Sequence, residues 1–234
     1  MKIALLGYGR MGKAIAEVAK TRGHKIVATI DKDNPNDVFD DADVAINFSV
    51  PSAAVSNITH ALQQGVPVVC GTTGWLSHKS DIEGLCTEQN GAFLYASNFS
   101  LGVNIFFALN KKLAQMMEQH AQYSASLEEI HHTEKLDAPS GTAITLAEGI
   151  LPHIPQNEWK LAEEASKNDL PITALREPHV PGTHTVTYNS DVDKIQIEHI
   201  AHSRDGFALG AVVAAEWIVG KNGIFTMNDV LNIT

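Results

Sequence analysis

The sequence predicts an α/β domain built on a parallel sheet, joined to an α+β unit with a mixed sheet. One observation is the regular succession of short apolar runs and amphipathic segments over the first hundred residues, which is typical of parallel crossover units. A second is a glycine-rich turn between the first apolar run and the segment after it. A third is a change of pattern near residue 103, after which polar and apolar residues alternate as in half-buried strands.

The first hundred residues read as strands alternating with helices. The predicted helix over 51–65 begins with a proline, which suits a first helical turn, and ends with a glycine, which suits a C-cap. We expect strands over 2–7, 25–31, 43–49, 66–75 and 92–104, the last leading into a polar turn, and helices over 13–23 and 51–65.

From residue 103 onward the pattern indicates a second unit. We expect helices over 104–121, 139–151, 206–220 and 227–233, strands over 125–132, 182–190 and 194–203, and a Pro-rich irregular stretch over 152–181. The apolar helix from 206 is expected to return to the first domain, which would then comprise 1–103 and 206–234, with 104–205 as the other domain. Two connections between domains would form a hinge that closes over a ligand.

The composition fits a folded protein that binds a small molecule. Hydrophobic residues make up 44% of the chain and charged residues 19%, which allows a packed core. The formal net charge is −10 and Lys and Arg form no block, so we expect neither nucleic acid nor a membrane surface as a partner. Cys70 and Cys86 lack a CxxC spacing and no signal peptide is evident, which predicts a cytoplasmic protein with reduced thiols.

A glycine-rich turn, GYGRMG, follows the first strand and opens the first helix. Gly7 permits a tight turn, Gly9 lets the backbone approach a pyrophosphate, and Gly12 lets the helix pack closely on the strand. Asp31 ends the second strand, where a carboxylate accepts hydrogen bonds from ribose hydroxyls. With strand, helix and acid in register, the segment predicts a Rossmann-type dinucleotide-binding domain; the alternative is a glycine turn used only for packing.

The choice between NADH and NADPH is left open by two neighbouring residues. Asp31 favours NAD, because its charge repels a 2′-phosphate, whereas Lys32 either pairs with that phosphate or is an ordinary surface lysine. Ligands of open α/β sheets lie beyond the carboxyl ends of the strands. Residues there are therefore expected to line the nicotinamide side of the site, unless they only serve turn chemistry. They are Gly71, Thr72, Thr73, Ala96, Ser97, Asn98 and Phe99.

The stretch EIHHTEKLDAPSGTA, residues 129–143, gathers cations and hydrogen-bond donors in an acidic chain. His131 and His132 are adjacent on a predicted strand, so their side chains point to opposite faces and do not suit a shared metal ion. The sequence has no HExxH motif, and we expect no metal site. Packing of the histidines in the core is the other alternative.

The same stretch predicts a cradle for a small anion. Ser140 can cap the following helix, Gly141 lets a ligand approach the backbone, and Thr142 adds a hydroxyl. Free N–H groups and the helix dipole favour a carboxylate at this position. Lys135 and the two histidines add positive charge and leave one acid to donate a proton, for which imidazole is well suited.

These residues carry a family resemblance. HHTEKLDAPSGTA resembles the HHxxKxDxPSGTA signature of the dihydrodipicolinate reductase (4-hydroxy-tetrahydrodipicolinate reductase) family, and GYGRMG, CGTTGW, ASNFSLGVN and FALGAVVAAEWIVGKNGIFTMNDVL extend the similarity over the whole chain. The resemblance implies NAD(P)H-dependent reduction of a cyclic hydroxy-dicarboxylate with loss of water, in the diaminopimelate and lysine pathway. It also implies a homotetramer in which the substrate domains, here 104–205, pack their sheets together.

Residue roles follow from the same resemblance. His131 is implied as proton donor or acceptor and Lys135 as a second proton donor, and which of them donates stays open. The implied substrate contacts are His132, Ser140, Gly141 and Thr142. The implied cofactor contacts are Gly7, Tyr8, Gly9, Arg10, Met11, Gly12, Asp31, Lys32, Gly71, Thr72, Thr73, Ala96, Ser97, Asn98 and Phe99.

The sequence departs from many members of the family in two places. Its glycine loop is one residue shorter, and Asp31-Lys32 stands where many have Glu-Arg, so NADH or NADPH or both are expected as cofactors. Two other functions are left to consider. An aspartate- or homoserine-type dehydrogenase would share the first hundred residues but lack the HHxxK–PSGT run, and a non-catalytic dinucleotide sensor would not need the paired donors.

Overall fold

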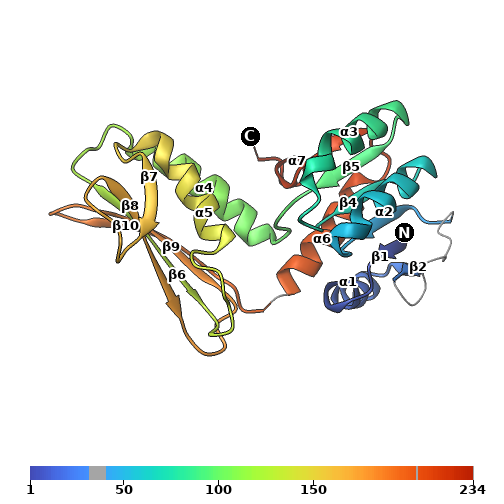
Figure 1. Ribbon diagram of the computed structural model, residues 1–234, viewed down its shortest axis with the longest axis horizontal. Coiled ribbons are helices and arrows are strands. Elements are labelled where there is room, and N and C mark those ends of the chain that lie inside the picture. Colours follow the sequence, from blue (N-terminus) through green and yellow to red (C-terminus); the bar gives the residue numbers. More distant parts are fainter. Residues whose placement is uncertain (32–40, 204, 234) are drawn as a thin grey trace. The chain divides into compact units, whose positions relative to one another are not determined.

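The computed structural model describes residues 1–31, 41–203 and 205–233. The chain divides into two compact units, Met1–Leu101 with Asp205–Thr234, and Gly102–Arg204 (Figure 1). Each unit has its own sheet, with two hydrophobic cores in the first unit and one in the second. Over the described residues, no helix combines the length and apolar character that crossing a membrane requires.

The first unit is a doubly wound, six-stranded parallel sheet of order β11-β5-β4-β3-β1-β2. Its strands are β1 (Lys2–Leu6), β2 (Lys25–Ile30), β3 (Val44–Asn47), β4 (Val68–Cys70), β5 (Ala92–Tyr95) and β11 (Gly223–Phe225). Its helices are α1 (Arg10–Thr21), α2 (Pro51–Gln63), α3 (Lys79–Glu88), α6 (Asp205–Ile218) and α7 (Met227–Leu231), with a short 3₁₀ turn at Leu76–His78.

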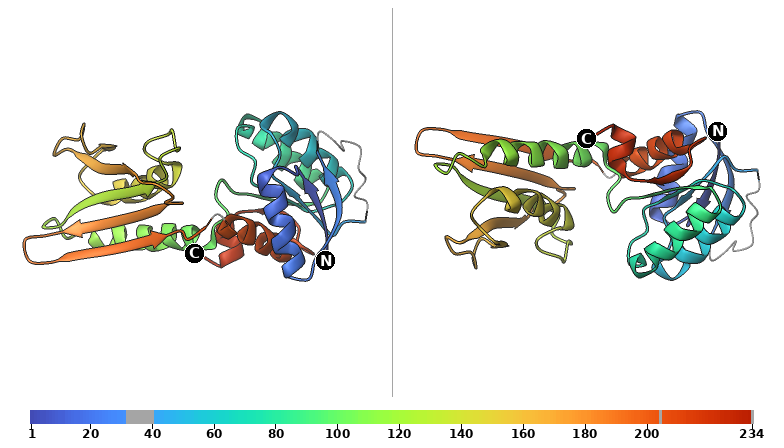
Figure 2. Two further views of the ribbon diagram at one scale, coloured as in Figure 1. Left: turned by 90° about the horizontal axis from the view of Figure 1, so that it is seen from below. Right: turned by 90° about the horizontal axis from the view of Figure 1, so that it is seen from above.

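Alternation along the strands feeds two cores, one on each face of this sheet. In β1, Ile3 and Leu5 pack with residues of α1, α6 and α7, whereas Ala4 and Leu6 pack with residues of α2 and α3. The helices accordingly lie on the two faces of the sheet (Figure 2). This confirms the predicted Rossmann-type parallel sheet, and helices cover both of its faces. Cys70 and Cys86 are free thiols in the second of these cores.

The second unit is a mixed sheet of order β10-β9-β6-β8-β7. β8 pairs in parallel with β6 and β7, and β9 pairs antiparallel with β6 and β10, as the prediction of a mixed sheet requires. α4 and α5 cover one face of this sheet and form its core with residues of the inner face. The elements are α4 (Leu101–Met117), β6 (Ser124–His131), α5 (Gly141–Ile150), β7 (Glu158–Leu161), β8 (Asp169–Arg176), β9 (Thr183–Asn189) and β10 (Lys194–Ile200).

The prediction that 152–181 is irregular was wrong. The stretch begins inside a 3₁₀ turn at Leu151–His153 and contains β7 and β8, and β8 lies between two other strands. Leu170 and Ile172 alternate inward, but Pro171 between them hides this strand pattern. We also did not predict α3 and β11. β11 is only three residues long. The predicted strand over 92–104 ends at Tyr95, because α4 already begins at Leu101.

Candidate active site

The glycine turn of the first unit is packed at two positions and open at the third. Gly7 has a φ of +104°, and a Cβ there would lie 2.4 Å from the carbonyl oxygen of Phe48. A Cβ on Gly12 would lie 2.2 Å from the carbonyl oxygen of Gly7. Gly9 is the N-cap of α1 and has no side-chain cap. Apart from its chain neighbours, no described residue has an atom within 4 Å of where a Cβ on Gly9 would stand. The backbone at the start of α1 is therefore accessible, and the first N–H groups of the helix suit a phosphate.

The loops after β4 and β5 meet around an aromatic side chain that sequence reasoning missed. Phe48 follows β3, and a Cβ on Gly71 would lie 2.2 Å from its ring. The Phe48 ring also packs on that of Phe99, with centroids 5.4 Å apart, and Phe99 is buried in the core. Thr72 is buried too, and its Oγ1 accepts a hydrogen bond from the backbone N–H of Ser49. Phe99 and Thr72 thus support the loops from beneath.

The remaining residues predicted for the cofactor lie at the same edge of the sheet. Asp31 is half-buried at the end of β2, and Lys32 lies outside the described residues. The segments after β1, β4 and β5 carry the other predicted contacts, which are half-buried or exposed: Tyr8, Arg10, Met11, Thr73, Ala96, Ser97 and Asn98. Because these strands are parallel, their carboxyl ends bring the loops together.

In the second unit, His131 ends β6 beside a buried carboxylate. Glu129, two residues earlier on the same strand face, has no exposed surface, and its Oε2 lies 3.3 Å from Nδ1 of His131. The ring of His184 from β9 meets the His131 ring edge-on, with centroids 5.0 Å apart. Burial lowers the pKa of His184 to about 4, so this imidazole is neutral near pH 7.

Glu129 carries a negative charge in the interior. Burial by itself raises the pKa of a carboxyl, but here contacts with His131 and Ser140 outweigh burial and lower the pKa to about 2. The backbone N–H of Ser140 donates to both carboxylate oxygens, at 3.0 and 3.1 Å. Nη2 of Arg176 lies 3.4 Å from Oε1. The buried carboxylate is therefore matched by a guanidinium and an amide.

Lys135 lies on the loop between β6 and α5. Its Nζ is 2.8 Å from both carboxylate oxygens of Asp137, which lowers the pKa of that carboxyl. Arg176 holds the backbone of the same loop: Nη2 donates to the Asp137 carbonyl at 2.6 Å and Nε to the Lys135 carbonyl at 3.3 Å. His132, the first residue after β6, is half-buried.

The start of α5 is built as an N-cap, as predicted from the sequence. Oγ of Ser140 accepts a hydrogen bond from the Ala143 N–H at 3.2 Å and lies 3.2 Å from Nε2 of His184. Ser140 is buried by these contacts, whereas Gly141 is exposed and Thr142 half-buried. Among the described residues no acceptor pairs with the backbone N–H groups of Gly141 and Thr142. These two groups are available to an anion.

Glu129, His131 and His184 also lie close enough for their ligand atoms to hold a metal ion. The guanidinium of Arg176 already provides positive charge beside Glu129. The positive charge of Arg176 would repel a cation bound there, so the cluster is better suited to proton chemistry than to metal binding.

Comparisons with known proteins cover the whole chain. The family models for the N-terminus and C-terminus of dihydrodipicolinate reductase match residues 1–99 and 102–231. The chain is 57% identical over 235 residues to 4-hydroxy-tetrahydrodipicolinate reductase from Christiangramia forsetii, with 99% of this chain and 98% of that protein covered. It is 33% identical over 246 residues to the reductase of the same name from Alkaliphilus metalliredigens, with 100% of both covered. A dipicolinate-bound dihydrodipicolinate reductase from Paenisporosarcina has the same fold, with a TM-score of 0.77 at 21% identity over 97% of both chains.

Proposed function

The chain belongs to the dihydrodipicolinate reductase family, and we propose that it reduces 4-hydroxy-tetrahydrodipicolinate to tetrahydrodipicolinate with loss of water, in diaminopimelate and lysine biosynthesis. The two family models confirm the resemblance found in the sequence. Membership makes the chain an oxidoreductase, which decides against a non-catalytic sensor. The match of both family models, which includes the second unit, decides against an aspartate- or homoserine-type dehydrogenase.

One observation of the geometry carries the assignment of the substrate site. His131, the loop with Lys135 and the open start of α5 meet around a single buried carboxylate in the second unit. We assign residues 104–205 to substrate binding and residues 1–103 with 206–234 to the dinucleotide. A dicarboxylate such as dipicolinate, which the Paenisporosarcina reductase binds, is the class of ligand that this donor set would take.

The cofactor is assigned to the carboxyl edge of the first sheet. The uncapped start of α1 at Gly9 suits a pyrophosphate, and Asp31 would accept hydrogen bonds from ribose hydroxyls. When bound, NADH or NADPH supplies a hydride from the nicotinamide ring. The balance between the two cofactors depends on Asp31 together with Lys32.

The second unit's own residues bind the substrate and supply its proton. The Gly141 and Thr142 N–H groups and the Lys135 ammonium would hold a substrate carboxylate, which displaces Asp137 from Lys135. Nε2 of His131 would then donate the proton that completes the reduction, with Lys135 as the second candidate donor. His132 would add a further contact to the substrate. No metal ion enters this scheme.

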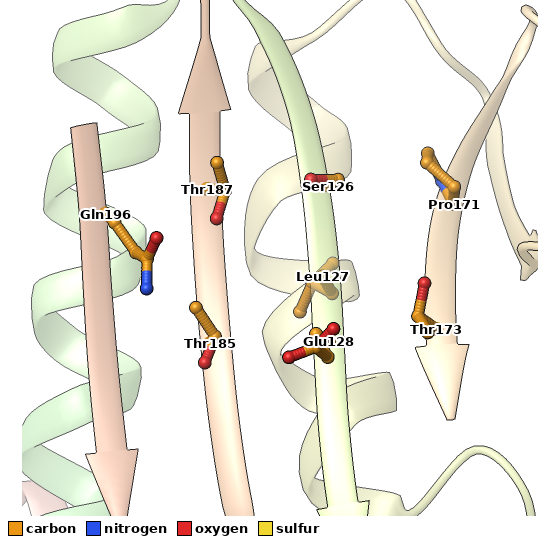
Figure 3. A pocket seen from close by; sticks show the side chains of 8 residues that line it. All are labelled: Ser126, Leu127, Glu128, Pro171, Thr173, Thr185, Thr187 and Gln196. Atoms are coloured by element: carbon orange, nitrogen blue, oxygen red, sulfur yellow. The ribbon is translucent and has the colours of Figure 1, made fainter. Parts of the chain in front are cut away.

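The open face of the second sheet is the proposed contact between copies of the chain. On the side away from α4 and α5, a depression of about 230 Å³ runs across β6, β8, β9 and β10 (Figure 3). The residues that line it are mostly small or polar: Ser126, Leu127, Glu128, Pro171, Thr173, Thr185, Thr187 and Gln196. Leu175 on β8 and Ile200 on β10 add exposed apolar surface. We assign this face to the homotetramer that the family resemblance implies.

Enzymatic activity tests the proposed function. The substrate is generated in place by a synthase that condenses pyruvate with aspartate semialdehyde, and loss of reduced-nicotinamide absorbance is followed with NADH and with NADPH. We expect oxidation that depends on the synthase product. Folded protein that binds NADH but oxidises neither cofactor would refute the proposal.

A further inference from the structure

We infer that Glu129 is the positioning residue of the proposed substrate site: its carboxylate sets which ring nitrogen of His131 exchanges protons with the ligand. The same carboxylate joins this histidine to the Lys135 loop and to the start of α5. The inference rests on the proposed function, in which His131 donates the proton. It adds a residue that no motif in the sequence singles out.

The first step concerns the ring nitrogens of His131. Nδ1 is buried and lies 3.3 Å from Oε2 of Glu129; among the described residues it makes no hydrogen bond of standard geometry. Nε2 is directed toward Gly182, where a Cβ would stand 3.0 Å from it. The carboxylate therefore faces one nitrogen, and a residue without a side chain faces the other.

This arrangement selects one protonated form of the imidazole. A proton on Nδ1 is attracted to the carboxylate, which leaves Nε2 as the nitrogen that takes up and releases a proton. Carboxylates that face Nδ1 in this way orient the histidines of hydrolases and of metal sites. Glu129 would act through His131 and would not touch the substrate.

The second step concerns the other parts of the site. The Ser140 N–H donates to Glu129 and so ties the start of α5 to this carboxylate. Arg176 lies beside Oε1 of Glu129 and donates to the carbonyl groups of Lys135 and Asp137. The buried carboxylate of Glu129 thus links His131, the Lys135 loop and the start of α5.

The third step is the charge around His131. The charged and titratable groups of the cluster around His131 and Glu129 come from β6, β8, β9 and the loop after β6, and they are Arg176, His184, Lys135 and Asp137 beside these two residues. His184 is neutral near pH 7, and Lys135 is paired with Asp137. Glu129 is the anion within 3.3 Å that an imidazolium at His131 would meet.

A charge-neutral variant of nearly the same shape tests the inference. We expect Glu129→Gln to lower kcat about 10- to 100-fold, a part of the 10²–10⁴-fold that general acid catalysis contributes. The alkaline limb of the kcat/KM profile should move to lower pH, because the imidazolium has lost its neighbouring anion. The Kd for NADH should not change. Glu148→Gln, on the exposed side of α5, is the matched control.

The outcomes separate this inference from the proposed function. Wild-type kcat and an unshifted pH profile in folded Glu129→Gln would overturn the positioning role while the reductase stands. An inactive wild-type protein would instead refute the function.

Nitrogen-15 NMR of the wild-type rings tests the inference without relying on the variant's folding. The His131 signals are identified by their loss in His131→Ala. We expect the neutral ring to carry its proton on Nδ1, and a neutral ring protonated on Nε2 would overturn the inference.

Discussion

A Cβ atom on Gly182 would lie 3.0 Å from Nε2 of His131. Such a contact is closer than ordinary van der Waals packing, so the ring of His131 occupies space that only a glycine leaves. Gly182 immediately precedes β9, two residues before His184, and its carbonyl accepts a hydrogen bond from the Ala201 N–H. Nε2 of His131, the nitrogen that is proposed to exchange protons, therefore lies against backbone that carries no side chain.

Gly182→Ala should displace this nitrogen by a few tenths of an ångström. We expect kcat to fall about tenfold, because small displacements of reacting groups reduce rates strongly. NADH binding, measured by fluorescence titration, should not change. An alanine variant with wild-type kcat would show that the ring has room to move without consequence.

His131→Ala removes the proposed proton donor. We expect kcat to fall about 10²–10⁴-fold, with the Kd for NADH unchanged, because the cofactor is assigned to the other unit. Steady-state kinetics and a cofactor titration measure the two quantities. His120→Ala, at an exposed position after α4, serves as control. Near-wild-type turnover of His131→Ala would leave Lys135 as the donor.

Asp31→Ala should change the balance between cofactors. We expect NADH to bind more weakly, since Asp31 would contact a free ribose hydroxyl, and NADPH to be affected less because a carboxylate repels its 2′-phosphate. Dissociation constants for both cofactors, measured on wild type and variant, give the comparison. Equal weakening of the two would argue against this contact.

Thr187→Arg places a long cation in the depression on the open sheet face. If four copies pack through this face, each substitution would bury an unpaired charge, which is strongly unfavourable. We expect light scattering to report a smaller assembly than for wild type, with the circular dichroism spectrum preserved. Gln115→Arg on the exposed side of α4 is the control. A variant that keeps the wild-type mass would place the interface elsewhere.

Glu216 on α6 links to the end of α1 and should make stability depend on pH. Its carboxylate pairs with Arg22 at 2.7 Å and with Nε2 of His24 at 2.7 Å, and the hydrogen bond from Arg22 is the main reason that its pKa falls to about 2. A lowered pKa means that the contribution is present above about 4.5, the ordinary value, and is lost as the pH falls toward 2.

The expected size of this contribution is about 1 kcal/mol, since Arg22 is 40% exposed and solvent screens the pair. We expect Glu216→Gln to lower the free energy of unfolding by that amount at pH 7 and to narrow its difference from wild type in acid. Urea denaturation at several pH values measures both. Glu88→Gln at the end of α3 is the control, and an equal loss of stability at every pH would contradict the assignment.

The sequence was most informative where one short motif performs one local task. The close packing of Gly7 and Gly12 could be predicted from the GYGRMG motif alone. Ser140 could be recognised as an N-cap because its side chain and the N–H group that it binds are only three residues apart. The mixed sheet was predicted from alternation in its antiparallel strands. Pro171 hid the alternation of β8, so the strand that carries Arg176 was missed.

Contacts between residues that are far apart in the chain could not be predicted from the sequence. Glu129 shares a strand face with His131, and period-two alternation could have drawn attention to it, but burial of its charge depends on Arg176, 47 residues away. His184 reaches the same cluster from β9. Phe48 lies within the predicted strand over 43–49, yet its packing on Phe99 depends on the order of strands in the sheet.

Binding of dipicolinate tests the central claim, that the residues around the end of β6 hold a dicarboxylate. Calorimetry on wild type, Lys135→Ala and the exposed-site control Lys167→Ala, each saturated with NADH, gives three affinities. We expect the first and third to agree and Lys135→Ala to bind roughly 10- to 100-fold more weakly, because a charge-assisted hydrogen bond contributes roughly 1.5–3 kcal/mol. Equal affinity in all three proteins would place the dicarboxylate elsewhere and contradict the account.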